Sequence, residues 1–167
     1  MRKHAGGFVF IVLVLLASVV LAVLAPVAPA RASYIQGTTA AGGTTNQNIR
    51  TIGATFVNGG AALTGSTTSC TVVYFAGTIQ QVDLIADQSG SATVDVQTVA
   101  FGSYTGPGSA ASITAADTPA LSSAVKFSDS TLTGWTTGVT ANSVFCFVLS
   151  SPTTVTYVEA VLKVAAN

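Results

Sequence analysis

The two cysteines are the residues whose type and number first suggest a covalent link. Cys70 and Cys146 are the only cysteines among the 167 residues, and an even number is typical of disulfide bonding in exported proteins. A bond between them would close a loop of about 75 residues, which stabilises by roughly 4 kcal/mol in the chain-entropy model. Two buried free thiols that pack as small apolar residues are the alternative. The sequence leaves both open.

Groups for acid–base or metal catalysis are scarce. The only histidine, His4, precedes a long N-terminal apolar run, so the rest of the chain lacks the histidine of Ser-His-Asp and Cys-His hydrolases. A His-containing zinc site is excluded for the same reason, and two cysteines are too few for a four-cysteine zinc site. We therefore expect a protein that is not an enzyme and binds no cofactor.

Three aspartates form the one candidate metal site. Asp83, Asp87 and Asp95 lie in one short stretch and could gather around calcium together with backbone carbonyl oxygens. Aspartates are also common on strand faces and in turns, where they bind no metal. The turn signal Asp87-Gln88-Ser89-Gly90 predicts a hairpin, which would make Asp83 and Asp95 the closest acidic pair.

The aromatic residues provide candidates for stacking on sugar rings, and Tyr104 and Trp135 are the two we single out. Tyr104 lies in a stretch rich in glycine, serine and proline, so its ring is expected to be exposed. Trp135 follows Gly134 and precedes Val139 at the end of an expected strand. This placement favours a buried position in which the ring fills one end of the hydrophobic core. Tyr74 and Tyr157 are further aromatics of this kind.

The elements that must position these side chains are strands. Beta-branched residues recur in short alternating runs separated by glycine-based turns, a pattern that fits a pleated sheet better than a helix. The expected strands are 50–57, 70–76, 79–86, 92–97, 144–149 and 153–164. Strands 70–76 and 144–149 are almost continuously apolar, as in strands buried on both faces. The pattern predicts an all-β, antiparallel β-sandwich of jelly-roll-like type, with helix confined to a short turn over 119–124.

The N-terminus has the features of an export signal. Arg2, Lys3 and His4 precede the apolar run Phe8–Leu24, and Ala30-Arg31-Ala32 suits cleavage before Ser33. A membrane anchor is the alternative. The sequence therefore predicts a signal peptide over 1–32, a flexible lead rich in threonine and glycine over 33–48, and a β-domain over 49–167. We expect the protein to be secreted or held at the cell surface.

Charge limits the partners. Charged residues make up only 7% of the chain, and three basic residues follow the signal: Arg50, Lys126 and Lys163. So few cations argue against nucleic-acid binding through phosphate neutralisation.

From Gly77 onward the chain resembles a domain found in tailed-phage structural proteins, notably tail-fibre and tail-associated proteins. The matching stretches, in order, are Gly77-Thr78-Ile79, 84–91 (LIADQSGS), Val94-Asp95-Val96, Ser112-Ile113-Thr114, 118–124 (TPALSSA), 129–136 (DSTLTGWT) and 155–164 (VTYVEAVLKV). The resemblance implies a β-sandwich module of a virion surface without enzymatic activity. Its expected partners are further copies of itself or other virion or surface proteins, with a cell-surface glycan as an expected ligand. A secreted or surface-displayed bacterial adhesion or carbohydrate-binding module is the alternative.

Overall fold

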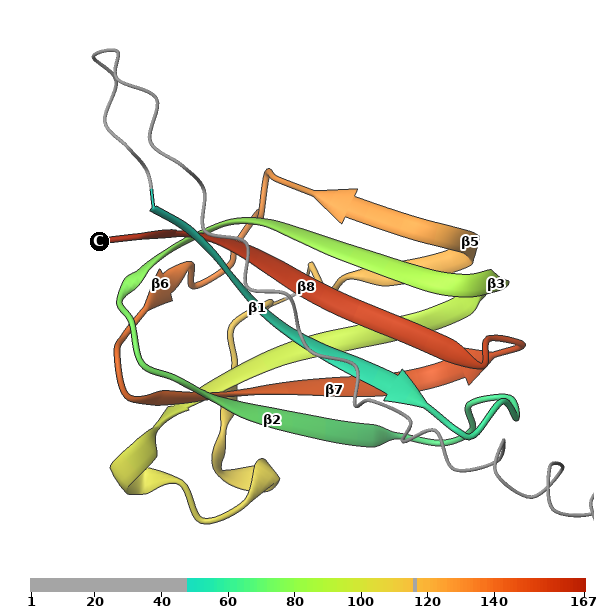
Figure 1. The fold of residues 1–167 in the computed structure, drawn as a ribbon, viewed down its shortest axis with the longest axis horizontal. Helices are drawn as coiled ribbons and strands as arrows, with labels where there is room; N and C mark the ends of the chain where they lie inside the picture. The colour runs from blue at the N-terminus through green and yellow to red at the C-terminus, as the bar shows by residue number, and fades with distance from the viewer. Residues whose placement is uncertain (1–47, 116) are drawn as a thin grey trace, which may run out of the picture. The chain divides into compact units, whose positions relative to one another are not determined.

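The computed structural model describes residues 48–115 and 117–167, and this part of the chain is an antiparallel β-structure (Figure 1). The expected all-β class is therefore confirmed. The predicted signal peptide over 1–32 and nearly all of the predicted lead over 33–48 lie outside the described residues. Within the described ranges, no helix is long and apolar enough to cross a membrane.

Eight strands form one hydrogen-bonded sheet. They are β1 (Asn48–Val57), β2 (Thr67–Val73), β3 (Gly77–Ala100), β4 (Ala111–Ser112), β5 (Ala120–Asp129), β6 (Gly138–Val139), β7 (Ser143–Thr153) and β8 (Tyr157–Ala166). Two short 3₁₀ helices, η2 (Phe101–Ser103) and η3 (Pro107–Ser109), follow β3.

Alternation of side chains explains how the strands bury one face. In β8 the four apolar side chains Val158, Ala160, Leu162 and Val164 are fully buried, and the residues between them are more exposed. In β7, five successive residues from Ser143 to Phe147 are buried. The predicted burial of this strand on both faces is thus confirmed. The same prediction is wrong for β2, which lies at an end of the strand order and in which only Val73 is buried.

The predicted hairpin at Asp87–Gly90 is wrong. Residues 77–100 form one long strand, β3, whose two halves do not pair with each other. The first half pairs with β8 and the second half with β7, and β5 runs along both halves. The turn residues instead form a bend with shifts in register, visible in Figure 1. A reason is visible at Asp87, whose carboxylate binds the β7–β8 connection and so fixes the bend against that segment.

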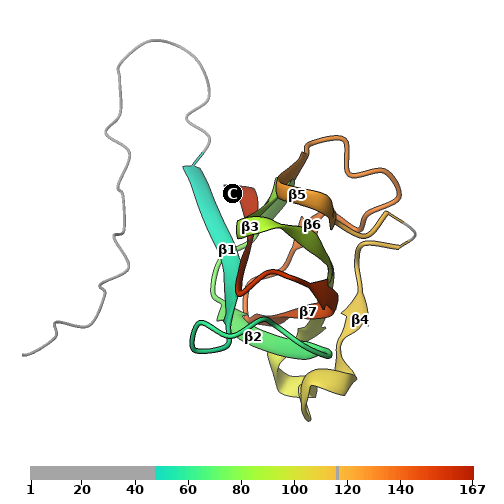
Figure 2. The same ribbon diagram turned by 90° about the vertical axis from the view of Figure 1, so that its right-hand side faces the viewer.

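The sheet curls at the bend in β3, where the pairing with β5 shifts register and β3 changes its neighbour from β8 to β7. One half then contains β1, β8 and the start of β3, and the other half contains β2, β7 and the end of β3. Figure 2 shows the strands arranged around a common centre. Apolar side chains from both halves, such as Leu84 and Leu162 with Phe145 and Phe147, belong to one core cluster.

The predicted helical turn over 119–124 is also wrong, because this segment joins the sheet as the start of β5. The carbonyl of Pro119 accepts a hydrogen bond from the backbone N–H of Val94, 2.9 Å away, and Leu121 lies opposite Ala92. Ala120, Leu121 and Ala124 all pair with β3, so the segment meets much of its hydrogen-bonding requirement in the sheet and not in a helical turn.

Candidate functional site

Cys70 and Cys146 are joined by a disulfide bond. They lie directly opposite each other on β2 and β7, so the bond links β2 to the strand with which it is hydrogen-bonded in the described part of the chain. This settles the choice between a disulfide and two free thiols. A structural disulfide is typical of an oxidising, extracytoplasmic compartment.

The three candidate calcium ligands are not brought together. Asp83 accepts hydrogen bonds from the Gln81 amide at 2.8 and 2.9 Å, and Asp95 accepts bonds from the hydroxyls of Ser112 and Thr114 at 2.6 and 2.7 Å. Asp83 lies opposite Val161 and Ser128, whereas Asp95 lies opposite Val148 in the other half of the sheet. In the described part of the chain, no three His, Cys, Asp or Glu side chains are placed to hold a metal ion.

The side chain of Asp87 links β3 to the start of β8 through hydrogen bonds. Its carboxylate accepts bonds from the Thr156 hydroxyl at 2.6 Å and from the backbone N–H groups of Thr156 and Tyr157, both at 3.1 Å. The Thr156 hydroxyl bond, helped by these N–H groups, lowers the pKa of Asp87 below its ordinary value of 3.8. All three bonds favour the charged carboxylate, which gives Asp87 a structural task.

The two candidate stacking aromatics have different surroundings. Trp135 is only 9% exposed and belongs to the core cluster, and its indole Nε1 donates a hydrogen bond to the backbone carbonyl of Asp117 at 2.9 Å. Its placement favours the core role over sugar stacking. Tyr104 is half-buried at the end of η2, where its backbone N–H bonds the Phe101 carbonyl. Neither residue lines the pocket described next.

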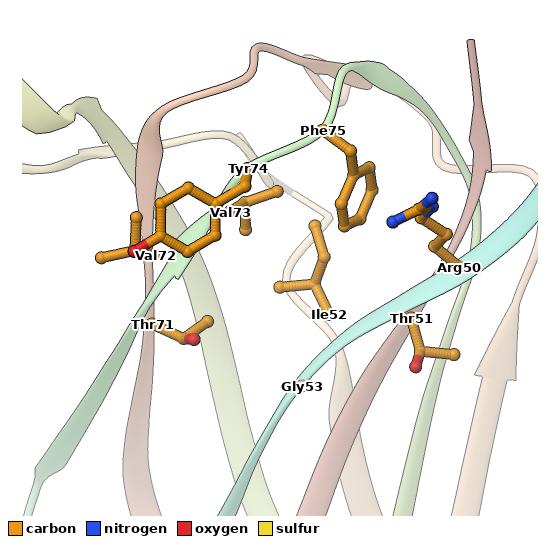
Figure 3. A pocket seen from close by; sticks show the side chains of 9 residues that line it. All are labelled: Arg50, Thr51, Ile52, Gly53, Thr71, Val72, Val73, Tyr74 and Phe75. Carbon is orange, nitrogen blue, oxygen red and sulfur yellow. The ribbon is translucent and has the colours of Figure 1, made fainter. Parts of the chain in front are cut away.

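An open pocket of about 380 Å³ lies where the two free edges of the curled sheet face each other (Figure 3). We call this gap between β1 and β2 the seam. Its lining residues come from β1 and from β2 and the segment after it: Arg50, Thr51, Ile52, Gly53, Thr71, Val72, Val73, Tyr74 and Phe75. Ile52 and Val73 are buried core residues, so the pocket opens onto one side of the hydrophobic core.

Arg50 supplies the only positive charge among the lining residues. Its guanidinium carbon lies 5.1 Å from the centre of the Phe75 ring, within the range of a cation–π contact. Its Nε atom is buried and has no hydrogen-bond partner in the described structure. Arg50 shares the face of β1 that carries the buried residues Ile52 and Phe56. From the sequence, Arg50 was counted only as a cation, and this site was not identified.

Tyr74 and two threonines complete the rim. Tyr74 is 77% exposed, the highest value among the large exposed apolar side chains of the described residues. Thr51 and Thr71 bring hydroxyl groups from opposite sides of the seam. None of the nine lining residues is acidic. The seam therefore combines a cation, an exposed aromatic ring and hydroxyl groups.

Comparison with known proteins gives no relative. The chain matches no protein-family model, no curated protein and no solved structure. Its function must therefore be argued from its own residues and geometry.

Proposed function

We propose that the protein is an exported, non-enzymatic attachment module, a jelly-roll-like β-sandwich of the kind found on phage tails and virion surfaces. Two features support the sandwich. The long strand β3 pairs with a different neighbour in each of its halves, and side chains from both halves of the sheet share one core. The disulfide between β2 and β7 supports export, since such bonds persist in oxidising compartments.

The observation that carries the attachment role is the seam pocket. Binding sites are typically concave, with apolar walls and a few placed polar groups, and here Ile52 and Val73 form the apolar part, with Arg50 as the charged group. The carboxylates are engaged elsewhere: Asp87 and Asp95 accept hydrogen bonds that tie loops to strands. This arrangement suits recognition of a surface rather than turnover of a substrate.

A secreted bacterial adhesion or carbohydrate-binding module is the second candidate function. The exposed ring of Tyr74 favours it, because an aromatic side chain at the mouth of a pocket offers a flat face to a sugar. In both functions the partners are other surface components, including further copies of the chain.

Binding to the envelope of the producing cells tests the attachment role. The full-length protein, fluorescently labelled after export and purification, should bind these envelopes saturably and be displaced by excess unlabelled protein. The absence of saturable binding would overturn the proposal. Sedimentation of the native protein separates the two candidates: presence in phage particles favours the virion role, and presence only in the envelope or medium favours the adhesion role.

A further inference from the structure

We propose that the seam pocket binds an acidic saccharide, with Arg50 pairing with the sugar carboxylate and Tyr74 stacking on the sugar ring. This inference rests on the proposed attachment function and names the ligand class for it. It is carried by the charge, the aromatic rings and the width of the seam.

The charge comes from Arg50, which lines the pocket. Arg50 is half-buried, and its Nε has no hydrogen-bond partner in the described structure. The Nε is closed to a ligand oxygen as it is to water, so the donors that a ligand can reach are the outer N–H groups of the guanidinium, which lines the pocket. A carboxylate is the matching acceptor, because its two oxygens accept the parallel N–H bonds of a guanidinium. Packing on Phe75 already restricts the side chain, which reduces the entropy lost on binding.

The aromatic ring indicates a sugar as the bearer of the carboxylate. Tyr74 stands across the seam from Arg50 and leaves most of its ring open (Figure 3). A pyranose ring presents C–H groups that pack against such a face, and its hydroxyls find partners in Thr51 and Thr71. A volume of about 380 Å³ is within the usual range for small-ligand pockets.

The width of the seam argues against an added peptide strand. A strand hydrogen-bonded to both edges would hold them about 9.5 Å apart, because neighbouring strands lie roughly 4.8 Å apart. In the structure, Cα atoms of β1 and β2 approach within 8 Å of each other. An extended peptide bonded to both strands therefore does not fit where they approach each other.

The test compares acidic saccharides with their neutral methyl esters. Oligogalacturonate and sialyllactose are titrated calorimetrically into the full-length exported protein, and each methyl ester is titrated in parallel. We expect at least one acid to bind, and its ester to bind about tenfold more weakly, because a charged hydrogen-bonded pair contributes on that scale. Failure of both acids to bind, or equal binding of acid and ester, overturns the inference.

Matched variants assign the contacts to residues. Arg50→Gln should weaken binding of the acid about tenfold, whereas Lys163→Gln, which removes the same charge from an exposed β8 position outside the pocket, should leave binding unchanged. Tyr74→Ala should weaken acid and ester alike, and Tyr104→Ala is its control. Unchanged affinity in Arg50→Gln contradicts the proposal. If Arg50→Gln does not fold, Arg50→Lys keeps the charge, lacks the paired N–H geometry, and should still bind more weakly.

Failure of this inference differs from failure of the attachment function. Saturable envelope binding without affinity for either acid overturns only the ligand class. Loss of envelope binding together with loss of acid binding overturns both.

Discussion

Trp135 is the residue with the largest expected effect on stability. Its ring is buried in the core cluster and its indole N–H satisfies the carbonyl of Asp117. Trp135→Ala should lower the free energy of unfolding by about 3–5 kcal/mol, because it leaves a cavity in the core. Denaturant unfolding of the variant measures this, with Tyr104→Ala as an aromatic control outside the core. A loss below about 1 kcal/mol would contradict the core role.

Asp87 should make stability depend on pH. Its pKa is lowered in the folded protein, chiefly by the Thr156 hydroxyl, so its stabilising contribution is complete above the unfolded value near 3.8. That contribution is lost as the pH falls below 3.8 through the lowered folded pKa. Melting temperatures are recorded over about two pH units, from about pH 5 downward. They should fall less steeply with decreasing pH for Asp87→Asn than for the wild type. Equal slopes for Asp87→Asn and the wild type would be the contrary result.

At the level of single residues, the sequence predicted those features that depend on the type of a residue and its neighbours in the chain. The two cysteines made a disulfide one of two predicted outcomes, and the structure shows the bond. The core position of Trp135 was predicted from its apolar neighbours and is confirmed. The hydrogen-bonding roles of the aspartates could not be predicted from the sequence, because the partners of Asp87 lie about 70 positions away in the chain. Arg50 was counted as a cation, but its role depends on Phe75 across the seam, which no local pattern reveals.

Among the elements, the bend in β3 is the feature on which the curl depends. A Cβ atom at Gly90 would collide with the backbone carbonyl of Thr153 and with Val155. Gly90→Ala should therefore destabilise the protein by roughly 1–3 kcal/mol, since a backbone neighbour cannot yield without shifting the strand. Gly102→Ala is the matched control, because a Cβ there meets nothing within 4 Å. Equal unfolding free energies for the two variants would argue against a tightly packed bend.

Strand positions were more predictable than strand partners. Alternation located β1 to within two residues at either end, because the burial of one face sets the period of the side chains. The expected strands 144–149 and 153–164 overlap β7 and β8 but differ from their ends by up to four residues. The hairpin failed because Asp87-Gln88-Ser89-Gly90 suits a turn equally well whether or not the two flanking segments pair. Here each segment pairs with β7 or β8, which lie far along the chain. Such distant pairing is not encoded in the local turn sequence.

For the whole molecule, the sequence predicted the all-β class, whereas the site was out of reach. The seam exists only because the curl brings β1 and β2, at opposite ends of the strand order, to face each other. The two strands come close to each other because several strands of the sheet bend. Composition excluded many functions in advance, but it gave no means of finding a pocket built from two sheet edges.

We propose that the molecule recognises a surface and does not cleave it. Two nearby carboxylates could hydrolyse a glycan if they lay roughly 5–9.5 Å apart across a substrate, and Asp83 and Asp95 were the pair that the sequence suggested. In the structure they lie in different halves of the sheet and are hydrogen-bonded to Gln81 and to Ser112 and Thr114. Neither residue lines the seam pocket.

The most direct test measures the release of soluble saccharide from envelopes incubated with the wild-type protein and with the double variant Asp83→Asn/Asp95→Asn. Bound protein is quantified in the same samples. We expect both proteins to bind equally well, and we expect no release above the protein-free control. Saccharide release by the wild type that disappears in the double variant would contradict the account and identify the protein as a glycan-cleaving enzyme.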